Sequence, residues 1–284
     1  MKNDILYSFR RCPYAIRARW ALLICEIKVE IREIDLKNKP QDFLNKSKTK
    51  TVPILIKKNN EVIEESLEII LWALSESKKE NIKLIYFPEN KKEEIFKLIN
   101  ENDNEFKYHL DRFKYATRYK DSDEEFHFTN AIKFIKRWNE LLAENKYFFG
   151  DSPTIADWSV WPFVRQFRIA CESQKRINYF EPSIKNWLDS FEKNKEFKSL
   201  MYKYELWEPN CRKNYFPFNS LSNNFLFSII LANSKKYPAV LNFPIFFSLK
   251  SRSLLISAVS AISKSKSFDP RLYNSPSSIS LPSK

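Results

Sequence analysis

Residues 7–15 of the chain are Tyr7-Ser8-Phe9-Arg10-Arg11-Cys12-Pro13-Tyr14-Ala15. They join a short apolar run, Ile5 to Ser8, to a stretch from Tyr14 to Cys25 that is rich in Ala, Leu and Arg and contains no helix breaker. This order predicts a strand, a turn and a helix. Proline is favoured at the first position of a helix, so we expect Cys12 at the N-cap.

The position of Cys12 at a helix N-terminus predicts a reactive thiol. Free backbone N–H groups and the positive end of the helix dipole stabilise a thiolate, and Arg10 and Arg11 add positive charge. We therefore expect Cys12 to be accessible and to have a depressed pKa, the alternative being a buried structural cysteine. The other cysteines lie among apolar or helical neighbours and are expected to be buried and inert: Cys25, Cys171 and Cys211.

Residues 1–78 alternate between strand and helix signals. After the first strand and helix, a second strand is expected around Val29 to Leu36, where apolar residues nearly alternate with charged ones. Two further strands at Val52 to Lys57 and Glu61 to Glu64 precede a closing helix at Ser66 to Ser75. The order β-α-β-α-β-β-α predicts an α/β domain.

Residues 91–212 carry helical periodicity and no strand signal, which predicts an all-α second domain after a linker at residues 81–90. Its clearest local signal follows Gly150, the single glycine of the chain. Thr154 is expected to cap a helix there, with Asp157 reaching back to the backbone N–H of the cap.

Residues 216–284 differ in composition from the rest of the chain. They contain 17 Ser and six Pro, and eight Lys or Arg against one acidic residue. The apolar patches Phe225 to Ala232 and Leu254 to Ile262 are short, so we expect a basic, unstructured tail. Docking of these patches on the body of the protein or on a membrane surface is the alternative.

Composition excludes several classes of function. One glycine cannot form a dinucleotide-binding or phosphate-binding loop, both of which need clustered glycines. Of the net charge of +13, the tail carries +7, and the body has interspersed charges, so no specific nucleic-acid partner is expected. The four cysteines and two histidines have no metal-ligand spacing, and no apolar run is long enough for a transmembrane segment, which predicts a cytoplasmic protein without metal.

The chain resembles cytosolic glutathione transferases, and within them the omega-like, cysteine-type branch. Four segments carry the resemblance, in the order and spacing of that branch: Cys12 to Ala15, Asp35 to Pro40, Thr51 to Leu55, and Glu64 to Ser66. The resemblance spans roughly residues 4–205 and excludes the tail. It implies a thioredoxin-like N-terminal domain followed by a helical domain, with glutathione as co-substrate.

The resemblance also implies a glutathione site. Pro53 would follow a cis peptide bond that turns the backbone of Val52 toward the cysteinyl part of glutathione. Ser66 and the helix N-terminus would hold the γ-glutamyl carboxylate, Glu65 the ammonium group, and Lys39 the glycine carboxylate. Taken alone, Ser66 could equally be an ordinary N-cap and Lys39 a solvated lysine.

Two departures from the family pattern affect the chemistry. The loop from Ser47 to Thr51 lacks the glycine that often precedes the Val-Pro pair. Ala15 occupies the place of the second cysteine of a dithiol motif, so the mechanism must be monothiol. It would pass through a mixed disulfide between Cys12 and glutathione, which a second glutathione resolves.

The resemblance therefore predicts a glutathione-dependent thiol transferase or reductase that acts on a small-molecule or glutathionylated acceptor. A homodimer is left open as its assembly. The acceptor is expected against helical aromatic residues: Tyr108, Phe113, Trp158 and Trp161. One alternative is conjugation of glutathione to electrophiles through Tyr7 or Ser8, and another is a non-catalytic glutathione-transferase-like interaction module.

Overall fold

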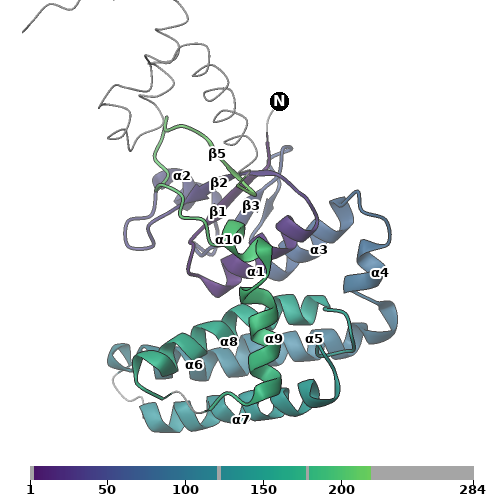
Figure 1. Ribbon diagram of the computed structural model, residues 1–284. Helices are drawn as coiled ribbons and strands as arrows, with labels where there is room; N and C mark the ends of the chain where they lie inside the picture. Colours follow the sequence, from purple (N-terminus) through teal and green to yellow (C-terminus); the bar gives the residue numbers. More distant parts are fainter. Residues whose placement is uncertain (1–2, 120–122, 177–178, 219–284) are drawn as a thin grey trace, which may run out of the picture. The chain divides into compact units, whose positions relative to one another are not determined.

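The computed structural model describes residues 3–119, 123–176 and 179–218. It contains a five-stranded mixed sheet with four strands from the N-terminal part of the chain and one from residues 214–216. The strands are β1 (Ile5–Ser8), β2 (Val29–Glu33), β3 (Ile54–Ile56), β4 (Val62–Ile63) and β5 (Asn214–Phe216). Their order is β4-β3-β1-β2-β5 (Figure 1). β1 runs parallel to β2 and antiparallel to β3, and Leu6 lies opposite Ile31 and Leu55.

Helices cover both faces of this sheet. Side chains alternate between the two faces along each strand, so apolar residues on both faces need a covering layer. Leu6 and Leu55 belong to the apolar core that includes α1 (Pro13–Ile24) and α3 (Ser66–Glu76). Tyr7, one residue further along β1, packs with Phe43 of α2 (Gln41–Lys46) on the other side. Strands and helices follow the predicted order through α3, and the thioredoxin-like prediction is confirmed.

The second part of the chain is helical, as predicted. Its α-helices are α4 (Ile82–Tyr86), α5 (Lys92–Glu101), α6 (Lys107–Lys114), α7 (Glu124–Glu144), α8 (Ile155–Ser173), α9 (Pro182–Glu192) and α10 (Lys195–Leu200). A π-helical turn, Asn102–Phe106, joins α5 to α6, and short 3₁₀ turns lie at Glu89–Lys91 and Ala116–Arg118. The short helix α4 lies within the segment predicted as a linker. Among the described residues, no helix is long and apolar enough to cross a membrane.

The predicted capping box opens α8. Thr154 N–H donates to Asp157 Oδ2 at 2.7 Å, and Thr154 Oγ1 accepts from Ala156 N–H at 3.3 Å. The fully buried Asp157 also accepts from Trp187 Nε1 at 2.9 Å, which ties α8 to α9. One carboxylate therefore starts the helix and anchors its neighbour.

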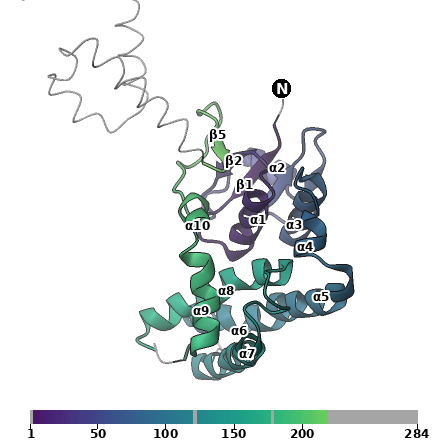
Figure 2. The ribbon, with the colours of Figure 1, turned by 45° about the vertical axis from the view of Figure 1, so that its right-hand side comes forward.

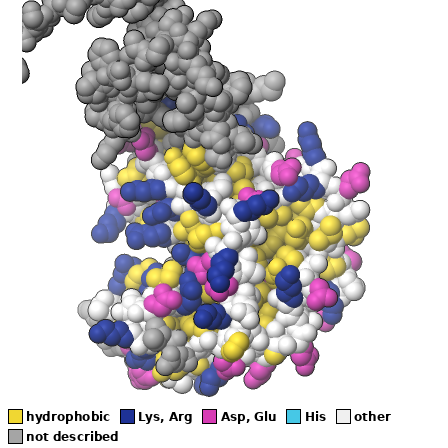
Figure 3. Space-filling view, in the orientation of Figure 1, with side chains coloured by type: hydrophobic (Ala, Val, Ile, Leu, Met, Phe, Trp, Pro, Cys, Tyr) yellow, Lys and Arg dark blue, Asp and Glu magenta, His cyan; other side chains and the backbone are white. Residues whose placement is uncertain are grey.

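The sheet part and the helical part share one apolar core. On α1, Trp20 meets Trp161 of α8 and Phe191 of α9, with ring centroids 5.5 and 5.4 Å apart. Both ribbon views show α10 beside α1 (Figures 1 and 2). In the space-filling view, lysine and arginine side chains are scattered among acidic and apolar ones over the face that is shown (Figure 3).

The segment after α10 returns to the sheet, which corrects the predicted boundary of the tail. Trp207 N–H donates to the carbonyl of Glu33 at 2.7 Å, and β5 pairs antiparallel with β2. Phe216 is fully buried, although the sequence placed it in an unstructured tail. An edge strand of three residues carries too weak a pattern to be recognised without its partner. The remainder of the predicted tail, residues 219–284, lies outside the described residues.

Candidate functional site

Cys12 occupies the N-cap of α1, as predicted. Its backbone is extended, with φ −71° and ψ 123°, and Pro13 follows at the first helical position. The Cys12 N–H donates to the carbonyl of Phe9 at 3.0 Å and closes a tight turn over Arg10 and Arg11. The thiol is half-buried, and Sγ lies 3.6 Å from the carbonyl oxygen of Val52. The turn thus presents the thiol to the loop before β3.

The prediction of a depressed pKa for Cys12 is wrong for this structure. Burial raises the pKa of the Cys12 thiol above its ordinary value, and this effect exceeds the opposing ones. The N–H groups of Tyr14 and Ala15 and the charges of Lys107 and Arg19 favour the thiolate. The local sequence identifies the N–H donors at the helix end, but it does not show how far the folded protein excludes water from the thiol, which raises its pKa.

Nor do the two adjacent arginines act as expected. The Arg10 backbone N–H donates to the Glu33 carboxylate, and the exposed Arg11 guanidinium lies over the Phe9 ring, 5.6 Å from its centroid. The cations that lower the pKa of Cys12 most are Lys107, from α6, and Arg19, from α1.

A cleft of about 600 Å³ lies beside this turn. Four residues of the predicted glutathione site line it together: Val52, Pro53, Glu65 and Ser66. The opposite wall is formed by α5 and the π-helical turn, including Asn100 and Asp103, and Tyr14 lies near the thiol. The structure therefore brings the two predicted motifs, Thr51 to Leu55 and Glu64 to Ser66, to one surface.

The loop before β3 reaches this surface without the glycine that the family often has. Lys50 takes the left-handed conformation instead, with φ 55°, and the Glu64 carboxylate accepts from the N–H of Lys48 at 2.6 Å. The peptide bond between Val52 and Pro53 is cis, as the resemblance implied. A side-chain carboxylate and one left-handed lysine thus take over the role expected of a glycine.

Ser66 is the first residue of α3 and is held by a residue that the sequence analysis missed. Its Oγ accepts from Arg17 Nε at 3.0 Å, and both terminal nitrogens of Arg17 donate to Asp103 at 2.8 Å. Arg17 is itself buried. A charged residue amid the apolar positions of α1 was the available signal for Arg17, whereas no local pattern marks Asp103.

The remaining predicted ligands differ in their placement. Glu65 is exposed at the N-cap of α3, and its side chain makes no capping hydrogen bond. Lys39 does not line the cleft; its ammonium group donates to the carbonyl of Lys50 at 2.9 Å. The lysine therefore braces the loop before β3 in this structure.

Residues considered for other roles lie mainly in the core. Tyr7 is fully buried on the α2 side of the sheet, where its hydroxyl donates to Asp42 and accepts from Arg32. Burial raises the pKa of this hydroxyl. Ser8 is also fully buried. Of the aromatic candidates for the acceptor, three are core residues, Phe113, Trp158 and Trp161, and only Tyr108 is exposed. Helical spacing alone did not distinguish core from cleft.

The other cysteines agree with the sequence prediction except at one position. Cys25 and Cys171 are buried, and burial raises the pKa of each to about 12. Cys211 is exposed and follows the last helix, so the prediction that it is buried is wrong. Residue 211 belongs to the irregular return to the sheet, which has no helical neighbours to cover it.

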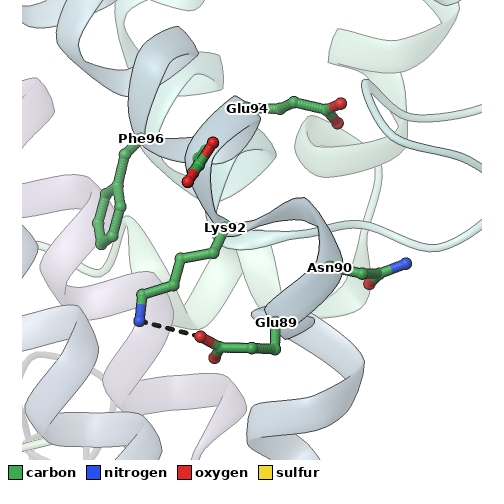
Figure 4. Close-up of a pocket in the computed structure, with 6 residues that line it drawn as sticks. Glu89, Asn90, Lys92, Glu94 and Phe96 are labelled. Atoms are coloured by element: carbon green, nitrogen blue, oxygen red, sulfur yellow. Dashed lines mark hydrogen bonds and ion pairs between the residues drawn. The ribbon is translucent and has the colours of Figure 1, made fainter.

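A second cavity, of about 480 Å³, lies at the start of α5 (Figure 4). Its lining residues are Glu89, Asn90, Lys92, Glu93, Glu94 and Phe96. Glu89 and Lys92 form an ion pair at 3.2 Å, and Phe96 borders both cavities. None of the predicted site residues lines this cavity.

Comparison with known proteins agrees with the fold. Residues 6–81 match the N-terminal domain of glutathione S-transferases, and residues 125–190 match the C-terminal domain. Mouse glutathione S-transferase omega-1 is 27% identical over 191 residues, which cover 66% of this chain and 76% of the relative.

Solved structures share the fold at low sequence identity. A glutathione transferase family member from Pseudomonas fluorescens pf-5, with two glutathione bound, superposes with a TM-score of 0.60 at 16% identity, covering 70% of this chain and 92% of that one. Glutathione transferase Omega 3C from Trametes versicolor gives 0.58 at 17% identity, covering 72% and 92%. Because both domains match in their expected order, the chain belongs to the glutathione S-transferase superfamily, and its similarity to omega-1 relatives makes it omega-like.

Proposed function

We propose that the protein is a glutathione-dependent thiol transferase or reductase in which Cys12 is the nucleophile. The observation that carries the proposal is the placement of Cys12 Sγ 3.6 Å from the carbonyl of Val52, a residue that lines the cleft together with Glu65 and Ser66. Cys12 does not itself line the cleft but contacts Val52, which does. Glutathione carries a thiol and an amino acid head group, so it fits a cleft with a cysteine beside one wall and the N-terminus of α3 at another.

The walls of the cleft fit the groups of glutathione. The N-terminus of α3 offers free N–H groups to the γ-glutamyl carboxylate. Because the Ser66 oxygen already accepts from Arg17, its hydroxyl hydrogen is available to donate to that carboxylate. The exposed Glu65 suits the ammonium group, and the backbone of Val52 suits the cysteinyl part. Lys39 would serve the glycine carboxylate only after leaving the carbonyl of Lys50.

The reaction proceeds in two exchanges of sulfur partners. The Cys12 thiolate attacks the glutathione sulfur of a glutathionylated acceptor, which forms a Cys12-glutathione disulfide and releases the acceptor as a thiolate that takes up a proton. A second glutathione, as its thiolate, attacks the glutathione sulfur held on Cys12 and leaves as oxidised glutathione. The acceptor is reduced by two electrons, and Cys12 returns to its thiolate.

The position of Ala15 explains why a second glutathione is needed. Ala15 lies in the first turn of α1, three residues beyond Cys12, and is fully buried. It offers no thiol to displace the bound glutathione, so the resolving sulfur must enter through the cleft. The N–H groups of Tyr14 and Ala15 and the charge of Lys107 stabilise Cys12 as attacking and leaving thiolate.

Reductase and conjugation assays on the wild type and Cys12→Ser test this proposal. We expect Cys12→Ser to lose reduction of a glutathionylated peptide. If conjugation to an electrophile dominates and survives in Cys12→Ser, the conjugating alternative replaces the proposal. Tyr7 and Ser8 are fully buried, which argues against either as the group that activates glutathione.

Retention on immobilised glutathione separates an enzyme from a non-catalytic interaction module, because a module with a decayed site would not be retained. We place the activity in the cytoplasm, where glutathione keeps thiols reduced. A homodimer is the assembly that we propose to test by sedimentation.

A further inference from the structure

Arg19 is a fully buried arginine beneath the turn that carries Cys12. Its three guanidinium nitrogens donate to carbonyl oxygens from three segments of the chain. Nη2 reaches Arg10 at 2.7 Å, Nε reaches Ala15 at 3.2 Å, and Nη1 reaches Leu200, at the end of α10, at 3.1 Å. The guanidinium thus connects the thiol turn, the first turn of α1 and the end of α10.

Glu33 holds the same turn from the end of β2. Its carboxylate accepts from the N–H of Arg10, so both the N–H and the C=O of Arg10 are bound by buried charged side chains. The charge of Glu33 acts on Arg19 and favours its protonated form, whereas burial lowers the pKa of Arg19. Arg19 and Glu33 are both buried and carry opposite charges, and together they bind the backbone of Arg10 in the thiol turn. We call this pair the clamp.

Arg19 of the clamp also acts electrostatically on Cys12. The charge of Arg19 lowers the pKa of the Cys12 thiol, as does that of Lys107 from α6. Other charged or titratable groups act on this pair and its neighbours. Tyr204 and Arg10 act on Arg19, and Asp103, Arg17, Asp111 and Cys12 act on Tyr14. Arg19 differs from Lys107 because it is buried and fixed by three hydrogen bonds, whereas Lys107 is paired with Asp111.

We infer that Arg19 is a positioning residue for the Cys12 reaction, which together with Glu33 fixes the turn that presents the thiol and supplies a fixed positive charge beneath it. This inference rests on the proposed function of Cys12. A planar guanidinium donates in three directions from one fixed plane, which an ammonium group on a flexible stem cannot do. Arg19 also donates to the carbonyl of Leu200 at the end of α10, so this helix helps to hold the clamp in place.

The test is the pH dependence of Cys12 alkylation in Arg19→Met and Arg19→Lys, measured peptide by peptide by mass spectrometry because the exposed Cys211 also reacts. In Arg19→Met we expect the midpoint to rise by about one pH unit, since a nearby opposite charge shifts a pKa by about one to three units. The thiolate fraction and kcat at neutral pH then fall roughly tenfold, while the KM for glutathione changes less than about twofold.

Arg19→Lys separates charge from geometry and provides a second variant should Arg19→Met fail to fold. It keeps the charge and loses at least two carbonyl contacts, so its midpoint should stay within about 0.3 pH unit of the wild type. Its kcat should still fall, by about threefold or more, because the turn is less fixed. A wild-type kcat in Arg19→Lys would refute the positioning role.

Arg165→Met is the matched control. It removes a half-buried arginine that donates to Glu192 at 2.9 Å between α8 and α9, so it should lower thermal stability without moving the Cys12 midpoint. An Arg19→Met profile identical to that of the wild type, or a shift equal to that in Arg165→Met, would overturn the inference. Cys12→Ser distinguishes the two failures: if it retains reductase activity, the proposed function fails, and if it is inactive while Arg19→Met is unaffected, only this inference fails.

Discussion

Arg17 binds Asp103 through two parallel hydrogen bonds of 2.8 Å, one from each terminal guanidinium nitrogen. The pair connects α1 of the sheet part to the π-helical turn of the helical part. Both Asp103 and Ser66, the other partner of Arg17, line the same cleft. One buried arginine therefore sets the spacing between opposite walls of the candidate site.

Asp103→Ala should lower the free energy of unfolding by about 2 to 3 kcal/mol, because it leaves the charge of Arg17 buried without its carboxylate and with only the hydrogen bond to Ser66. Asp103 is 23% exposed, so the loss should stay below that of a fully buried pair. Denaturant titration measures it. Asp189→Ala, which breaks a pair with the exposed Lys193, is the control and should cost less than about 1 kcal/mol. An equal cost in both variants would contradict the role assigned to Arg17.

Cys12 should titrate above the value of about 8.5 that an unperturbed cysteine has. Burial raises its pKa, so the thiolate fraction, and with it the alkylation rate, should rise steeply only on the alkaline side of that value. Alkylation of the free protein from pH 6 to 10, compared with a small thiol under the same conditions, measures this. A midpoint below 8.5 would show that the helix-end donors and nearby charges outweigh burial.

Ser66→Ala should weaken glutathione binding by roughly tenfold, the expected loss for one hydrogen bond to a charged group. Calorimetry gives the affinity, and a separate unfolding titration shows how much stability is lost when Arg17 Nε loses its acceptor. Ser75→Ala, in the same helix but with an exposed hydroxyl that donates to Trp72, is the matched control. Unchanged affinity in a folded Ser66→Ala protein would remove Ser66 from the site.

A chain ending at residue 213 should melt several degrees below one ending at residue 218. The shorter chain loses β5 and the buried Phe216, and removal of a buried phenylalanine side chain costs about 3 to 5 kcal/mol. In a domain of this size, 1 kcal/mol corresponds to about 2 to 4 °C. Phe216→Ala in the full chain should reproduce much of the loss. Equal melting temperatures for the two truncated chains would show that β5 contributes nothing to the fold.

The local features of the site followed from neighbouring residues in the sequence. Proline is favoured at the first position of a helix, because its fixed φ suits the helix and its missing N–H is not needed there. Pro13 therefore predicted Cys12 as the N-cap, where the structure places it. Thr154 and Asp157 are three residues apart and meet across a single helical turn, so their capping box was also predictable. Such interactions depend on a few backbone torsions and not on the rest of the chain.

The electrostatics of Cys12 were not predictable in the same way. The sequence showed two arginines beside the thiol, but the cations with the largest effects on its pKa are Lys107 and Arg19. Lys107 comes from a helix of the second domain, and the degree of burial depends on how the two domains pack. A pKa reflects the balance of desolvation, charges and hydrogen bonds in three dimensions.

By itself, the sequence determined the order of strands and helices through α3, the N-cap position of Cys12 and the two motifs that meet at the cleft. Torsional preferences and side-chain periodicity act over a few residues, so such features can be predicted locally. Only the tertiary structure decided that Arg17 meets Asp103, that Arg19 and Glu33 hold the thiol turn, and that Phe216 completes the sheet. These contacts join residues far apart in the chain, and burial of charged and apolar groups selects them only once the whole core has formed.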